Sequence, residues 1–90
     1  MIPMDQNFLT GHQIAAARTL ANMTQKDLAD RANISVPTLK RMEGTKGEIV
    51  AMSNNARAVR GALEDAGVVF LSDGETTSGG PGVRLRVRQS

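Results

Sequence analysis

The sequence predicts a mainly α-helical domain of four or five short helices, followed by a two-stranded β element near the C-terminus. Three observations support this fold class. Apolar residues between positions 10 and 66 recur at spacings of three and four residues, which is typical of amphipathic helices. Capping residues, among them Thr10, Thr24 and Ser35, precede these segments. Over residues 83–88 the spacing changes to strict apolar/basic alternation, which predicts a strand.

The first helix is predicted over residues 11–21, with Thr10 as its N-cap. Asn22 and Met23 interrupt the helical pattern after it. The residues on its buried face are predicted to be Ile14, Ala17, Leu20 and Ala21.

The second helix is predicted to follow Thr24 and to extend over about eight residues. Its inward-facing side chains are Leu28, Ala29 and Ala32. Asn33 comes next, and because asparagine accepts a left-handed backbone, it indicates a tight turn between two helices.

The third helix is predicted to begin after Ser35 and to end at Gly44. Pro37 falls in its first turn, where a missing backbone N–H has no intrahelical partner to lose. Leu39 and Met42 are predicted to face inward.

Residues 45–53 are predicted to form a linker from which Ile49 or Val50 reaches the core. Either Ser53 or Asn54 then caps a fourth helix. The buried face of that helix consists of Ala56, Val59, Leu63 and Ala66.

After Gly67, which ends the fourth helix, the pattern changes to that of strands. Val68–Leu71 is a short apolar run of strand type, residues 72–82 form a Gly-, Ser- and Thr-rich loop, and residues 83–88 alternate. The two strands either pair with each other as a hairpin or pair with a second copy of the chain.

Composition narrows the class of protein. With 90 residues, the chain is long enough for one domain and too short for two. It has no cysteine and one histidine, His12, which excludes disulfides and thiolate zinc sites and argues against metal or acid–base catalysis. Phe8 and Phe70, the only aromatic residues, are too few to stack the bases of single-stranded nucleic acid. We therefore expect no enzymatic activity, no cofactor and no metal site.

Charge is unevenly distributed. The formal net charge is +2, and residues 83–90 contain Arg84, Arg86 and Arg88 but no acidic residue. Residues 1–11 lack Lys and Arg and any long apolar run, unlike a secretory signal, and no stretch reaches the roughly 18 apolar residues of a membrane-spanning helix. We therefore expect a soluble, cytoplasmic protein with no membrane partner.

Residues 24–44 predict a helix-turn-helix. Two short helices flank a turn of about three residues, with the small residue Ala29 at their crossing and apolar Ile34 after the turn. The side chains predicted to fill the angle between the helices are Leu28, Ile34, Leu39 and Met42.

This segment resembles the XRE, or Cro/C1-type, helix-turn-helix family of bacterial and phage regulators. The matching positions, in order, are Thr24-Gln25, Leu28-Ala29, Ile34-Ser35, Leu39 and Glu43-Gly44. The resemblance covers residues 18–44 and implies a lambda-repressor-like DNA-binding domain. The sequence departs from the family pattern at Asn33, where glycine is commonest, and at Pro37, which leaves only apolar contact available at its position.

In a helix-turn-helix, the start of the second helix of the pair approaches base edges in the major groove. Arg41 can donate two hydrogen bonds to a guanine, and Val36 and Pro37 can pack on a thymine methyl. Ser35 or Thr38 can bond to a base or a phosphate.

Phosphate contacts are expected mainly around the helix before the reading helix. The resemblance implies that Gln25 and the free N–H groups at this helix start bind backbone phosphate. Arg18 has two alternative roles: a phosphate contact or, as the resemblance favours, an ion pair with Glu43. The expected phosphate-binding residues are Thr24, Gln25, Lys26, Lys40 and Lys46.

The resulting prediction is a sequence-specific double-stranded DNA-binding transcriptional regulator. A chain of this size has little room for an effector domain, so we expect a repressor that occludes a promoter as a homodimer on a palindromic operator. The alternative is a protein-interaction module, such as an antitoxin or antiactivator, that keeps the fold while a protein is its principal partner.

Three regions are predicted: an N-terminal tail (1–9), the DNA-binding domain (10–67) and a C-terminal β extension (68–90) that makes the dimer. The arginines of the extension either discourage uncontrolled edge pairing or border DNA or the dimer interface. The predicted dimerisation residues are Val68, Val69, Phe70, Leu71, Val83, Leu85 and Val87.

Overall fold

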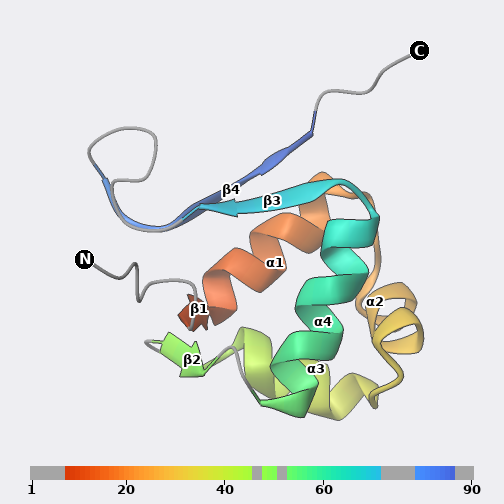
Figure 1. Cartoon of the computed structure of the whole chain (residues 1–90). Coiled ribbons are helices and arrows are strands. Elements are labelled where there is room, and N and C mark those ends of the chain that lie inside the picture. The colour runs from red at the N-terminus through yellow and green to blue at the C-terminus, as the bar shows by residue number, and fades with distance from the viewer. Residues whose placement is uncertain (1–7, 46–47, 51–52, 72–78, 87–90) are drawn as a thin grey trace.

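The computed structural model describes residues 8–45, 48–50, 53–71 and 79–86. Within these ranges lie four helices and two antiparallel pairs of short strands (Figure 1). The helices are α1 (Gly11–Leu20), α2 (Gln25–Ala32), α3 (Val36–Glu43) and α4 (Asn54–Asp65). The strands are β1 (Phe8–Thr10), β2 (Glu48–Val50), β3 (Val68–Leu71) and β4 (Gly82–Leu85). The predicted fold class is therefore confirmed.

Each described helix begins at a hydroxyl N-cap. Thr10, Thr24, Ser35 and Ser53 have extended backbones, and each side-chain oxygen accepts a hydrogen bond from the backbone N–H three residues later. Thr10 and Thr24 belong to complete capping boxes, in which the third helical side chain also accepts from the cap's backbone N–H. Ser53 rather than Asn54 is the cap of α4.

The turn between α2 and α3 depends on Asn33. Its φ of 58° and ψ of 45° are left-handed, which asparagine tolerates better than most residues. The backbone N–H of Ile34 then donates to the carbonyl of Ala29 at 3.0 Å, so the chain reverses within a few residues. This tight turn fixes the angle at which α3 leaves α2.

A single hydrophobic core joins all four helices and the β3–β4 pair. Each helix contributes at least one fully buried aliphatic side chain, and Val68 and Phe70 of β3 belong to the same cluster. The largest completely buried side chains are Leu9, Ile14, Leu28, Leu39, Leu63, Val59 and Val68.

The β1–β2 pair was not predicted. The sequence predicts a tail over residues 1–9 and a linker over residues 45–53, but Leu9 pairs with Ile49 and is only 2% exposed. Strands of three residues are too short to show a recognisable alternation. β1 leads directly into α1, so its pairing with β2 fixes the start of the first helix.

The strands β3 and β4 pair within one chain as an antiparallel hairpin, with Val68 opposite Leu85 and Phe70 opposite Val83. Gln13 of α1 ties the hairpin to the helices: its Nε2 donates to the carbonyls of Leu71 and Gly82 at 3.1 and 3.0 Å. The hairpin therefore packs against the helices, and the structure shows no break in packing at the predicted domain boundary after residue 67.

The hairpin and α3 lie on opposite sides of α1 and α4 (Figure 1). In the view of Figure 1 the hairpin crosses the top of the molecule and α3 lies at the bottom. The two surfaces that the sequence singles out are thus well separated.

Candidate nucleic-acid interface

The start of α3 presents a mixed polar and apolar surface. Ser35, Pro37, Lys40 and Arg41 are exposed, while Leu39 is fully buried. The buried leucine anchors one side of the helix in the core, so the opposite side must face outward. The half-buried residues at this helix start are Val36 and Thr38.

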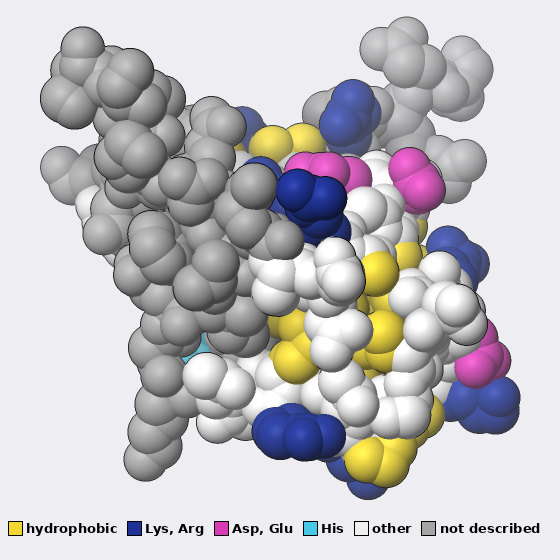
Figure 2. Space-filling view, turned by 60° about the horizontal axis from the view of Figure 1, so that its bottom comes forward, with side chains coloured by type: hydrophobic (Ala, Val, Ile, Leu, Met, Phe, Trp, Pro, Cys, Tyr) yellow, Lys and Arg dark blue, Asp and Glu magenta, His cyan; other side chains and the backbone are white. Residues whose placement is uncertain are grey.

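Figure 2 turns the α3 side of Figure 1 toward the viewer. Lys and Arg side chains stand at several points around this face, and small hydrophobic patches lie among polar and backbone atoms. This combination suits a groove-binding surface, because cations contact phosphates and short polar or methyl-bearing side chains contact base edges.

Two hydroxyls at the start of α3 are ordered by each other. Ser35 Oγ accepts from the Thr38 backbone N–H at 3.2 Å and donates to Thr38 Oγ1 at 2.8 Å. The hydroxyl hydrogen of Thr38 is then available to an external acceptor. Ser35 thus serves first as a helix cap, and Thr38 is the better placed of the two to contact a base or phosphate.

Pro37 is the second residue of α3, inside the first turn. Its lack of a backbone N–H removes no helical hydrogen bond there. The helix is therefore undistorted, and the ring is exposed on the outer side. Pro37 offers an apolar contact of fixed geometry.

The N-terminus of α2 is closed by its own side chains. Thr24 donates its backbone N–H to Asp27 Oδ2 at 3.0 Å, and Asp27 returns its N–H to Thr24 Oγ1 at 3.0 Å. Two hydrogen bonds with Thr24 hold the pKa of the Asp27 carboxyl below its ordinary value. The bond from the Thr24 backbone N–H has the larger effect, and the bond with the Thr24 side chain has the smaller one. The Asp27 carboxylate therefore already lies beside the free backbone N–H groups of the first turn of α2, where a phosphate would bind.

Glu43, the last residue of α3, joins three elements. Arg18 of α1 donates to it from Nε at 2.8 Å and from Nη2 at 3.2 Å, and Gln25 of α2 donates from Nε2 at 3.1 Å. A third guanidinium nitrogen, Nη1 of Arg18, bonds the carbonyl of Met23 at 3.1 Å. The Arg18 side chain is 20% exposed and that of Glu43 is 9% exposed, which places the pair mostly inside the fold.

The cations expected to contact phosphate differ in their surroundings. Lys26 bridges to Asp30 at 3.0 Å, but both side chains are largely solvated, so the bridge is weak. Within the described part of the chain, neither the Lys40 side chain nor the Arg41 side chain forms an ion pair or a hydrogen bond, and the Arg41 carbonyl accepts from Thr45 Oγ1 at 2.9 Å. Lys46 lies outside the described residues.

A close approach between backbones, for which the sequence gives no signal, holds α1 against the end of α3. A Cβ added at Gly11 would lie 2.5 Å from the carbonyl oxygens of both Met42 and Glu43. Only glycine fits there. A single glycine directly after a capping threonine gives no signal that distinguishes this role from an ordinary helix start.

Residues 14–43 match a family model described as Helix-turn-helix. The matched segment extends from the first turns of α1 to the end of α3, and so includes Arg18, Gln25 and Glu43. A search of curated proteins found no match to the chain. The described residues contain no helix long and apolar enough to cross a membrane.

The fold and the match together identify a helix-turn-helix within residues 14–43. The match supports the resemblance to the XRE, or Cro/C1-type, regulators that residues 18–44 carry.

Proposed function

We propose that the protein is a cytoplasmic, sequence-specific double-stranded DNA-binding transcriptional regulator that reads the major groove with α3. The observation that carries this proposal is the exposed start of α3, held in a helix-turn-helix by buried Leu39 and the left-handed Asn33. The proposal includes no catalytic role and no cofactor.

In the proposed complex, base contacts come from α3. Arg41 donates to a guanine, Thr38 offers its hydroxyl, and the apolar Val36 and Pro37 contact thymine methyl groups. These proposed base contacts are supported by the exposure of Pro37 and Arg41 and by the partial exposure of Val36 and Thr38.

Phosphate contacts come from the start of α2 and from solvated lysines. Gln25 has one Nε2 hydrogen committed to Glu43 and a second for a phosphate oxygen. Lys26 and Lys40 add screened attraction, and Thr24 lies at the helix N-terminus where backbone N–H groups favour anions.

The proposal includes a homodimer, because one reading helix contacts only a few base pairs. The domain measures 36 Å by 35 Å by 18 Å. A domain of this width leaves room for two copies side by side on one face of the duplex, where successive major grooves are roughly 34 Å apart. Such a complex excludes other proteins from the same base pairs, which supports repression by promoter occlusion.

The predicted dimerisation residues differ in how much surface they leave for a second copy. Val68 and Phe70 are buried in the core of their own chain and have little surface to offer a second copy. Leu85 is 43% exposed, Val87 lies outside the described residues, and the hairpin is on the side away from α3. We therefore propose a homodimer whose interface does not require the hairpin. The residues left half-buried by the fold are Val69, Leu71 and Val83.

In vitro selection of duplex DNA by the full-length protein at about 0.15 M salt tests the proposal, because purely electrostatic binding fades at that salt concentration. The matched control is Arg41→Ala, which keeps the fold and removes a base contact. We expect a two-fold symmetric motif with half-sites about 10 base pairs apart. A single unrepeated half-site contradicts the homodimer. No enrichment by a folded protein contradicts DNA reading and favours the protein-interaction module.

A further inference from the structure

The β3–β4 hairpin has an open edge. The described sheet contains only these two strands, so one side of β4 has no strand beside it. The backbone N–H of Arg86 donates to the carbonyl of Gly67 at 2.7 Å, and the register pairs Arg84 with Val69. Hydrogen-bonded pairs alternate along an antiparallel ladder, so Val83 and Leu85 direct their N–H and C=O groups away from β3.

The two faces of this edge differ in chemistry. Arg84 and Arg86 lie on the outer face, both are exposed, and neither forms an ion pair within the described ranges. Val83 and Leu85 share the inner face with buried Val68 and Phe70, which lie opposite them. The open edge is thus basic on one face and aliphatic on the other.

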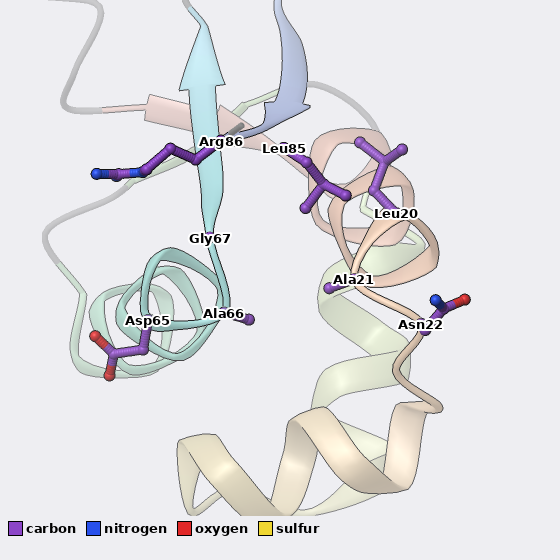
Figure 3. Close-up of a pocket in the computed structure, with 8 residues that line it drawn as sticks. All are labelled: Leu20, Ala21, Asn22, Asp65, Ala66, Gly67, Leu85 and Arg86. Carbon is purple, nitrogen blue, oxygen red and sulfur yellow. The ribbon is translucent and has the colours of Figure 1, made fainter. Parts of the chain in front are cut away.

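The inner face ends at an exposed apolar patch. Leu85 and Leu20 are 43% and 41% exposed, and they are the two large hydrophobic side chains exposed in the described part of the chain. The prediction that Leu20 lies on the buried face of the first helix is therefore wrong, because Leu20 is the last residue of α1 and extends past the core. Both leucines line an open cavity of about 460 Å³ together with Ala21 and Ala66. Figure 3 shows the leucines pointing toward one another, whereas the side chains of Asp65 and Arg86 extend to the other side of β3.

We propose that the open edge of β4 binds an extended acidic segment of a partner protein, which adds to the hairpin as a third strand. The partner's backbone pairs with Val83 and Leu85. Its acidic side chains lie opposite Arg84 and Arg86, and an apolar side chain between them packs between Leu85 and Leu20. The segment thus alternates acidic and aliphatic residues.

Charge argues against a second copy as the occupant. If two β4 edges pair antiparallel about Leu85, Arg84 of one copy lies opposite Arg86 of the other. A two-fold axis through Arg84 or through Arg86 likewise places that arginine opposite the same arginine of the other copy. Like charges directly opposite one another destabilise a sheet, whereas acidic residues at these positions stabilise it. Because the hairpin lies opposite α3, this partner and a DNA duplex bound at α3 occupy different sides of the protein (Figure 1).

The test uses the full-length protein and a capped peptide of about eight residues, the length of an ordinary strand, in which Glu and Val alternate. Binding is followed by amide NMR shifts and by fluorescence anisotropy of the labelled peptide. We expect shifts centred on residues 83–86 and slower hydrogen exchange at the N–H groups of Val83 and Leu85. A peptide N-methylated along the pairing edge should not bind, because it lacks the donors that a third strand needs.

Charge-reversed variants make the test specific. Arg84→Glu/Arg86→Glu should weaken binding of the acidic peptide on the order of tenfold and favour the same peptide with Lys in place of Glu. Arg57→Glu reverses an exposed arginine on α4 and should leave binding unchanged.

Several outcomes overturn the proposal. They are absence of peptide binding by the folded protein, equal binding by the charge-reversed variant, self-association that protects Val83 and Leu85 without peptide, and displacement of the peptide by duplex DNA. The DNA selection is read independently, so failure of either proposal is distinguishable from failure of the other.

Discussion

Arg18 and Glu43 connect the first and last helices of the helix-turn-helix region through two hydrogen bonds, of 2.8 and 3.2 Å. The residues are 25 positions apart, and Glu43 is the less exposed of the two. The guanidinium also bonds the carbonyl of Met23, and the carboxylate also accepts from Gln25. The pair is therefore the centre of a network that fixes α3 relative to α1 and α2.

Arg18→Ala should lower the free energy of unfolding by about 2–4 kcal/mol, because it leaves the mostly buried Glu43 carboxylate without its cation. Urea unfolding at neutral pH measures this loss. Lys26→Ala is the matched control: it removes an exposed ion pair and should cost less than about 1 kcal/mol. Arg18→Met/Glu43→Leu should recover part of the loss; a double variant no more stable than Arg18→Ala contradicts this account.

Gly11→Ala and Gly61→Ala should have opposite effects. The new Cβ at position 11 meets two carbonyl oxygens at 2.5 Å, whereas nothing lies within 4 Å of the new Cβ at position 61. We expect Gly11→Ala to destabilise the protein by about 1–3 kcal/mol and Gly61→Ala, within α4, to stabilise it by roughly 0.5–1 kcal/mol. Thermal unfolding of both variants checks the contrast, and equal effects would refute it.

Gln13→Met should loosen the hairpin more than the helices. Gln13 is only 6% exposed and also accepts the backbone N–H of Thr10 at 2.9 Å. Methionine retains the volume and removes these bonds, which should cost about 1–3 kcal/mol. Hydrogen exchange should accelerate at β3 and β4 amides well before those of α2 and α3. Uniform acceleration throughout the domain would show that Gln13 is not a local clamp.

Acid should weaken the start of α2. The pKa of Asp27 is lowered from its ordinary 3.8. A group with a lowered folded-state pKa stabilises the fold above its unfolded-state pKa, and this contribution is lost as the pH falls through the folded value. The unfolding free energy of the native protein should therefore fall more steeply below about pH 4 than that of Asp27→Asn. NMR titration of the Asp27 carboxyl measures the pKa directly, and parallel pH profiles would contradict the prediction.

Arg41→Ala and Lys26→Ala should separate base reading from phosphate attraction in the proposed complex. Removing Arg41 should cost roughly 1–3 kcal/mol of binding and relax the preference at one base pair. Removing Lys26 should weaken binding to all DNA sequences alike. It should reduce the slope of log affinity against log salt concentration by at most about 1, since Asp30 already neutralises part of the Lys26 charge. Binding measured against single-base operator variants at several salt concentrations distinguishes the two, and equal loss of preference would refute this division.

The features that the sequence predicts correctly depend on residues close together in the chain. The caps Thr10, Thr24 and Ser35 and the left-handed Asn33 depend on neighbours within four residues, so the sequence reveals them directly. Burial of Leu39 follows from helical spacing and leaves the outward side of α3 as the candidate reading surface.

The remaining features depend on contacts distant in sequence. Gln13 bonds carbonyls 58 and 69 positions away, and Gly11 meets the end of α3. A glutamine and a glycine at a helix start have many alternative roles, and no spacing selects among these. The direction of the hairpin, which takes its arginines away from α3, likewise follows only from the packing of Val68 and Phe70 on the helices.

The hydrogen bond from Gln25 to Glu43 also bears on how the domain meets DNA. A free glutamine samples many rotamers, and ordering such a side chain on binding typically costs about 0.5–1.5 kcal/mol. Here the carboxylate restrains the amide in the unbound protein. In the proposed complex, the conformational entropy of Gln25 is thus lost mainly when the domain folds, and the phosphate meets a donor that is already oriented.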